Sequence, residues 1–133
     1  MKEWIGVIAL VAATNAWASE DYKCTVERVV SAVESDSRSN YNQIFIGKQF
    51  TVERRSGRMA GALKNSYVTD PQVIDYGSAE ESFKVVTTMR KDQGAGAGSN
   101  IYALTISEYR EGAKKPFIFL ENGDAYLGNC EHF

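Results

Sequence analysis

The chain has 133 residues, of which 44% are hydrophobic and 24% are charged; this composition excludes a disordered or repetitive protein and fits one globular domain. Its 15 basic and 17 acidic residues give a formal net charge of −2, so no overall positive field favours nucleic acid or an anionic membrane. We therefore expect no nucleic-acid partner.

Residues 1–18 have the layout of a secretory signal peptide. Lys2 lies near the amino terminus, an apolar run covers residues 5–13, and Ala-Trp-Ala at 16–18 supplies the small residues that signal peptidase recognises. The apolar run is too short to span a bilayer, no later segment is long enough, and no Cys at the cleavage site accepts a lipid. We predict that the mature protein starts at Ser19, has no membrane span, and is periplasmic or secreted. Residues 19–133 are expected to form a single β domain. An uncleaved amino-terminal anchor is the alternative.

The expected export bears on the redox state of the two cysteines. These are Cys24 and Cys130, which lie near the two ends of the mature chain. Oxidising compartments favour disulfides, and only one intramolecular pairing is possible. A reactive thiol is the alternative, but the chain has no Cys-x-x-Cys motif and no internal His to activate one. We predict a Cys24–Cys130 disulfide, which requires Cα atoms within about 7 Å of each other.

Strand-like segments follow one another along the mature chain. Residues 22–27 alternate apolar and polar side chains with the period of two of a half-buried strand, and a polar stretch over residues 34–42 then interrupts this pattern. Further segments that alternate or are rich in β-branched and aromatic residues cover 44–52, 59–64, 83–89, 101–109, 117–120 and 125–130. Turn signals separate them at 56–57, 94–99, 112–115 and 122–123, of which the last, Asn-Gly, is a strong hairpin signal.

About eight short strands predict an all-β domain, either a small antiparallel barrel or a strongly curved meander sheet with one disulfide, because closure removes exposed sheet edges. Gly61 and Gly128 lie inside predicted strands, where such a sheet could bend. A two-layer β-sandwich is the alternative. The one helical signal is a capping box formed by Ser78 and Glu81, which predicts at most a turn or two of helix.

Arg54, Arg55 and Arg58 crowd one predicted hairpin tip, where we expect them to be exposed. Guanidinium groups in such a cluster suit a carboxylate or phosphate on a partner. Solvated turn charge is the alternative.

The glycine-rich stretch 94–99, which contains Gly96 and Ser99, lacks the following helix that phosphate-binding loops need. We interpret it as a flexible hairpin loop, with a lid over a binding cleft as the alternative. Tyrosines such as Tyr41, in its polar stretch, suit an interface because the ring is apolar and its tip is polar; filling and rimming a small core is the alternative.

Familiar catalytic and metal-binding patterns are absent from the sequence: it has no second histidine, no Gly-x-Ser-x-Gly motif and no zinc motif. His132 is next to the last residue, where we expect fraying and no catalytic or metal role. The acidic residues Asp70, Asp75, Glu80 and Glu81 lack calcium-loop spacing. We predict no enzyme, no cofactor and no metal site; an acid/base pair without a local signature is the alternative.

The mature chain opens with Tyr22-Lys23-Cys24 and ends near a second Cys, and in this outline it resembles the small periplasmic lysozyme inhibitors. The Ser-Gly-x-x-Tyr inhibitory loop of that group is not matched, because the nearest string, residues 98–102, reverses its start and alters its spacing. The resemblance therefore assigns no residues.

These observations favour a noncatalytic exported binding protein of the cell envelope that docks another protein, as an inhibitor or an immunity-type protein does. A carrier of a small apolar ligand in a barrel-type pocket is the alternative. A side-chain-filled interior would favour docking, whereas an open apolar pocket of roughly 300 Å³ or more would favour the carrier.

Overall fold

The computed structural model describes residues 20–33, 35–98 and 101–133, and β-strand is the main regular secondary structure in this part of the chain. The strands are β1 (Tyr22–Ser31), β2 (Gln49–Val52), β3 (Met59–Gly61), β4 (Gln72–Tyr76), β5 (Phe83–Thr88), β6 (Ile101–Ile106), β7 (Lys115–Glu121) and β8 (Asp124–His132). A helix, α1 (Asp36–Gln43), follows β1, and a 3-10 helix, η2 (Lys91–Gln93), follows β5. The predicted signal at 1–18, its cleavage point before Ser19, and Ser99 lie outside the described residues.

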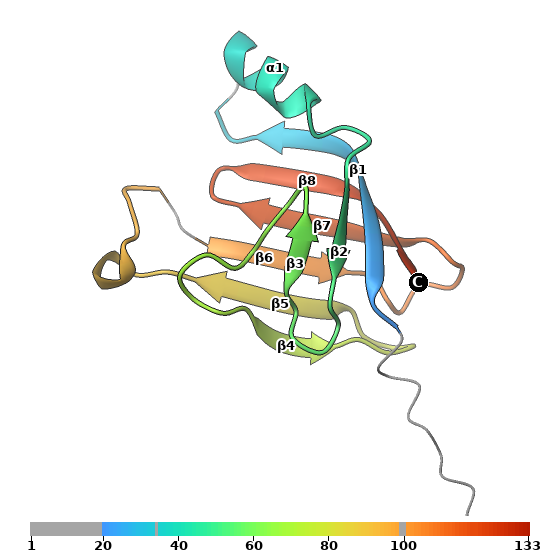
Figure 1. Ribbon diagram of the computed structural model, residues 1–133. Helices are drawn as coiled ribbons and strands as arrows, with labels where there is room; N and C mark the ends of the chain where they lie inside the picture. Colours follow the sequence, from blue (N-terminus) through green and yellow to red (C-terminus); the bar gives the residue numbers. More distant parts are fainter. Residues whose placement is uncertain (1–19, 34, 99–100) are drawn as a thin grey trace, which may run out of the picture.

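The eight strands form one antiparallel sheet in the order β3-β2-β1-β8-β7-β6-β5-β4, curled into a half-barrel (Figure 1). The prediction of an all-β, strongly curved sheet is therefore confirmed, as a single sheet and not as a two-layer sandwich. Strands β4 to β8 form the meander expected for the carboxy-terminal half, and its last turn, Asn122-Gly123, joins β7 to β8 with Asn122 at φ 55°. The first and last strands then pair, from Tyr22 opposite His132 to Ser31 opposite Asp124.

A β-bulge lies between Val26 and Arg28 of β1, opposite Gly128 of β8. A Cβ at Gly128 would overlap the Thr25 carbonyl oxygen, so the two backbones approach too closely there for any other residue. Such bulges increase the local twist of a sheet. The bend that we expected at Gly128 coincides with this bulge.

The concave side of the sheet is filled with side chains. Phe83 and Val85 of β5, Phe119 of β7 and Val26 of β1 are each at most 1% exposed. In Figure 1, β2 and β3 cross in front of β5 to β7, and the ring centroids of Phe50 in β2 and Phe117 in β7 are 5.1 Å apart. The hairpin therefore covers the core that the meander lines.

Two local features add to what the sequence indicates. The polar stretch predicted as a break contains α1, whose amino end is capped where Ser35 Oγ accepts a hydrogen bond from the Arg38 amide at 3.2 Å. Ser78 and Glu81 instead form a turn in which the Ser78 amide donates to the Glu81 carbonyl at 3.0 Å. A capping box alone does not start a helix when no apolar face follows it.

The predicted strands are close to the observed ones except at β2 and β4. Residues 44–48 of the predicted segment 44–52 form turns after α1, and the Gly47 amide donates to the Val26 carbonyl at 2.8 Å. β4 is an additional edge strand in which no residue is fully buried, and its sequence, Gln-Val-Ile-Asp-Tyr, does not alternate apolar and polar side chains as the predicted strands do.

The predicted disulfide is present: Cys24 and Cys130 are directly opposite each other in β1 and β8, with Cα atoms 3.9 Å apart. Both cysteines are fully buried. Among the described residues, no helix is long and apolar enough to cross a membrane.

Replacing both Cys24 and Cys130 by Ala is expected to lower the free energy of unfolding by about 4 kcal/mol, because the bridge closes a loop between residues 106 apart in sequence. Urea denaturation of the oxidised protein, the reduced protein and the double variant measures the loss. The reduced protein and the variant should agree. Equal stability of oxidised and reduced protein would contradict the prediction.

Candidate functional site

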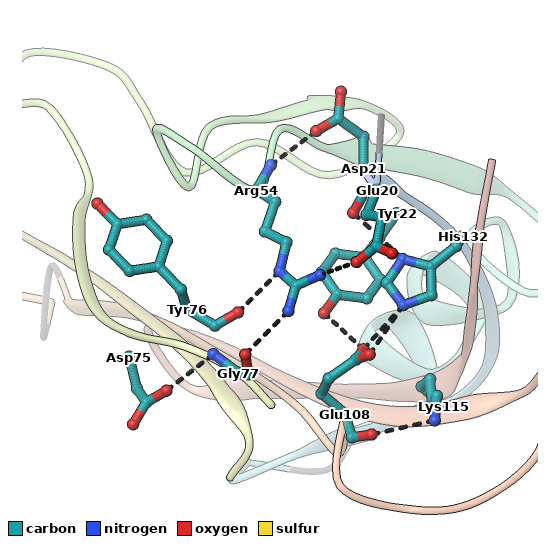
Figure 2. A network of polar contacts seen from close by, with 10 residues as sticks. All are labelled: Glu20, Asp21, Tyr22, Arg54, Asp75, Tyr76, Gly77, Glu108, Lys115 and His132. Atoms are coloured by element: carbon teal, nitrogen blue, oxygen red, sulfur yellow. Dashed lines mark hydrogen bonds and ion pairs between the residues drawn. The ribbon is translucent and has the colours of Figure 1, made fainter. Parts of the chain in front are cut away.

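A network of polar contacts fills the end of the sheet where β1 begins and β8 ends (Figure 2). Arg54, the second residue after the hairpin strand β2, lies at the centre of this network and is only 6% exposed. Its guanidinium donates to the carbonyls of Tyr76 at 2.8 Å and Gly77 at 2.9 Å, and it forms an ion pair with Glu20 at 2.6 Å. β2 and β4 lie towards opposite edges of the sheet, so Arg54 joins the two edges.

The expected exposure of Arg54 is therefore wrong. The hairpin tip turns the Arg54 side chain inward, over the ring of Tyr22 at 5.8 Å, while Arg55 and Arg58 stay exposed. Arg58 forms an ion pair with Asp70 at 3.0 Å in which both side chains are more than half exposed. Only Arg55 and Arg58 of the arginine cluster can meet a partner.

Tyr22, Glu108 and His132 complete the network beside Arg54. The Tyr22 hydroxyl donates to Glu108 Oε2 at 2.7 Å, and His132 Nε2 lies 3.0 Å from the same carboxylate. The Tyr22 and His132 rings are 4.6 Å apart, and His132 pairs with Tyr22 as the last residue of β8, so the fraying expected at His132 is wrong. Burial and the hydrogen bond to Glu108 raise the pKa of Tyr22, which keeps its hydroxyl protonated.

The contacts of this network fit a structural role, in which they hold the sheet together, better than a catalytic role. Burial raises the pKa of Glu108, but the hydrogen bonds from Tyr22 and His132 outweigh it, so that the pKa lies below its usual value and Glu108 stays ionised. A tyrosine nucleophile would need a lowered pKa, which Tyr22 does not have. Within the described residues, no group of three or more His, Cys, Asp and Glu could hold a metal ion.

The opposite end of the sheet carries α1 and a chain of aromatic rings. Tyr41 of α1 contacts Phe45 with ring centroids 5.4 Å apart, and Phe45 contacts Tyr126 of β8 at 5.3 Å. Tyr126 continues to the core residue Phe119 at 6.1 Å. The rings therefore connect the exposed Tyr41 to the fixed interior.

Polar contacts hold α1 over this end. Arg38 forms an ion pair with Asp124, the first residue of β8, which is only 6% exposed. Asp124 also accepts from Ser31 Oγ at 2.6 Å, and Ser31 Oγ accepts from the Asn42 side chain at 2.6 Å. Both ends of α1 are thus tied to the end of β1 and the start of β8.

A pocket of about 260 Å³ opens between α1, the segment after β3 and the β7–β8 turn. We call it the mouth pocket; it is lined by Arg38, Tyr41, Phe45, residues 61–64, Tyr67, Glu121, Asn122, Asp124 and Tyr126. Tyr67 lines the mouth pocket together with Tyr41 and contacts Tyr102 with ring centroids 5.5 Å apart. Tyr41 is 49% and Tyr67 58% exposed, so each presents part of its ring to a partner.

Glu121, which is partly buried, contributes the carboxylate of the mouth pocket. Burial raises its pKa, and so does Asp124, which lies directly opposite it across the hairpin, while Arg38 lowers it. Burial first and then the charge of Glu121 raise the pKa values of Tyr67 and Tyr126, so this carboxylate lies near both tyrosines. In the described part of the chain, the Glu121 carboxylate makes no hydrogen bond or ion pair.

The residues that the sequence suggested for binding do not form one site. Figure 1 shows α1, which carries Tyr41, at one end of the sheet and the β2–β3 connection, with Arg55 and Arg58, beside β4 at the other. Gly96 lies exposed in the segment between η2 and β6. Tyr41 alone lines the mouth pocket.

Sequence patterns do not indicate Glu121 or Asp124 as members of a site, and they indicate Tyr67 only as one of several tyrosines that suit an interface. One local signal could have found the acidic pair: a two-residue hairpin turn at Asn122-Gly123 places Glu121 and Asp124 opposite each other. No local signal predicts that Tyr67 lies near them, because the segment that contains Tyr67 is brought to the mouth pocket only by the tertiary structure. No family model, no curated protein and no solved structure matches this chain.

Replacing Arg54 by Ala is expected to lower the free energy of unfolding by about 3 kcal/mol, because two carbonyls and a carboxylate lose a charged donor in a buried place. The control is Arg55→Ala, an exposed neighbour whose loss should change stability by less than about 0.5 kcal/mol. Urea denaturation followed by circular dichroism measures both. Equal effects of the two substitutions would contradict the buried role of Arg54.

Glu121→Gln is expected to raise the melting temperature at about pH 8, because it removes a carboxylate whose raised pKa makes the ionised form unfavourable in the folded state. This increase in melting temperature should disappear at about pH 3, where the glutamate is protonated in both the folded and unfolded states. Calorimetry at the two pH values measures this difference, with Glu111→Gln, an exposed site, as the control. A lower melting temperature of Glu121→Gln at about pH 8 would contradict it.

Proposed function

We propose that this chain is a noncatalytic, exported binding protein of the cell envelope that docks another protein through the mouth pocket and its rim. The observation that carries the proposal is that two half-exposed tyrosines, Tyr41 and Tyr67, line one pocket together with the charged residues Arg38, Glu121 and Asp124. Tyrosine and arginine are enriched among the residues that dominate protein interfaces. The hollow beside the β2–β3 tip also combines a tyrosine with arginines, because Tyr76, Arg55 and Arg58 line it, but it contains one tyrosine and not two.

The scaffold under the mouth pocket supports docking. Tyr41 is fixed by its contacts with Phe45 and with Arg38, whose guanidinium lies 5.3 Å from the Tyr41 ring centroid, and α1 is tied down by the Arg38–Asp124 ion pair. A surface that is ordered before binding loses less conformational entropy on binding. The sheet and disulfide below it add to this order.

Two features support docking over the carriage of a small apolar ligand. The concave side of the sheet is filled by large side chains such as Phe50, Phe83 and Phe119, each at most 1% exposed. The mouth pocket, at about 260 Å³, is below the usual size of small-molecule sites, and Glu121 and Asp124 make it unsuitable for an apolar guest.

Export is the least direct part of the proposal and rests on two observations. The chain begins with residues that have the layout of a signal peptide. The Cys24–Cys130 disulfide is consistent with an oxidising compartment.

The experiment captures partners from an envelope fraction with the immobilised mature protein, identifies them by mass spectrometry and measures the Kd of each purified partner. The double variant Tyr41→Ala/Tyr67→Ala is expected to raise the Kd by about 30-fold or more, the usual effect of losing a dominant interface residue. The matched control is Tyr109→Ala, since Tyr109 is 46% exposed but lies outside the mouth pocket.

A second double variant, Arg55→Glu/Arg58→Glu, tests the other candidate surface, and unchanged binding is expected. Unchanged melting temperatures show that each variant is folded. If the tyrosine variant binds normally and the arginine variant does not, the docking surface is the β2–β3 tip, and the mouth pocket is excluded.

A further inference from the structure

We infer that the mouth pocket receives one basic side chain, a lysine or an arginine, from the docked protein, with Glu121 as its counter-ion. This inference rests on the proposed docking function and specifies the chemistry that the partner must present. The pocket is suited to that group by its charge, its rings and its size.

Among the described residues that line the pocket, Glu121 has a carboxylate with no hydrogen bond and no ion pair, although the charge of Arg38 acts on it. Glu121 and Asp124 are opposite each other across the hairpin, and Arg38 forms its ion pair with Asp124. Lys64 lines the rim and is exposed, and it forms no ion pair with Glu121. A partly buried carboxylate without a partner is unfavourable, so a cation that reaches Glu121 gains a strong, charge-assisted hydrogen bond.

The ring faces favour a cation as well. Three tyrosines line the pocket: Tyr41, Tyr67 and Tyr126 of β8. Aromatic faces attract ammonium and guanidinium groups, and the same surface already shows this contact, since Arg38 lies 5.3 Å from the centroid of the Tyr41 ring. The tyrosine hydroxyls also offer acceptor oxygens to a donor that carries several N–H groups.

The size of the pocket selects a side chain over a larger guest. Its volume of about 260 Å³ is less than the 300 to 1,000 Å³ that is usual for small-molecule sites. The apolar stem of lysine or arginine can lie along a ring while its charged head reaches Glu121. The pocket is also open to the surface, as an inserted side chain requires.

The test titrates uniformly ¹⁵N-labelled mature protein with acetyl-Gly-Lys-Gly-amide and acetyl-Gly-Arg-Gly-amide and follows the amide signals by NMR. The matched controls are the same peptide with norleucine, which keeps the stem without the charge, and with glutamate. We expect a basic peptide to shift the signals of Tyr67, Glu121 and Asn122 with a Kd of about 1 mM, as suits a single side chain. Glu121→Gln should raise this Kd at least about tenfold, and Glu111→Gln should leave it unchanged.

Equal shifts with the norleucine or glutamate peptide, or no shift with either basic peptide up to about 20 mM, would overturn the inference. A chitin trisaccharide in a parallel titration provides a different ligand class; if it alone shifts these signals, the pocket binds sugar, and the inference is also overturned.

The inference and the proposed function can fail separately. If the basic peptides do not bind but Tyr41→Ala/Tyr67→Ala loses the captured protein, docking at the mouth pocket stands and the basic group is wrong. If the basic peptides bind but that variant keeps its partner, the pocket chemistry stands and docking through it is wrong.

Discussion

The antiparallel pairing of β1 with β8 is the constraint on which the rest of the structure depends. In the sheet, the hairpin β2–β3 is attached through β1, and the meander from β4 to β7 is attached through β8. The pairing joins the first strand to the last and so orders almost the whole chain at once. Its formation therefore costs a large loop-closure entropy. The Cys24–Cys130 bridge lies within this pairing and reduces that entropy in the unfolded chain. The same pairing builds both ends of the molecule: it places His132 on Tyr22 at one end and Asp124 beside Ser31 at the other.

Arg54 makes the second long-range connection. An open sheet has two exposed edges, and a half-barrel without further contacts would leave the interior accessible between them. By reaching the carbonyls of Tyr76 and Gly77, Arg54 ties the hairpin edge to β4 with hydrogen bonds in place of a strand pairing. This explains why three neighbouring arginines have different surroundings: the hairpin turns Arg54 inward and leaves Arg55 and Arg58 in water. A cluster of arginines in sequence identifies charge but does not identify which side chain the backbone directs into the fold.

What could be predicted from the sequence follows from local physics. The alternation in segments such as 83–89 and the Asn122-Gly123 turn can be recognised from residues that are close in sequence. The disulfide can be predicted because only two cysteines are available. All three features are present in the structure. α1 could not be predicted, because it has no apolar face and is held by Asp124 and Ser31, which come from elsewhere in the chain. The mouth pocket could not be predicted for the same reason: Tyr41, Tyr67 and Glu121 lie far apart in sequence and meet only when the sheet curls.

The two ends of the sheet differ in how completely their polar groups are paired. At the end that contains Arg54, the side chains of Tyr22, Glu108 and His132 all have partners. At the other end, the Glu121 carboxylate has none among the described residues, and neither do the buried atoms Asn42 Oδ1 and Thr87 Oγ1. Thr87 is directly opposite Tyr102, which is directly opposite Glu121, and Asn42 donates to Ser31 at the end of β1, so the three groups lie at the same end of the sheet. Unsatisfied polar groups reduce stability and are retained where they serve another purpose. Their concentration beside the exposed tyrosines supports binding at this end, whereas the paired end closes the fold.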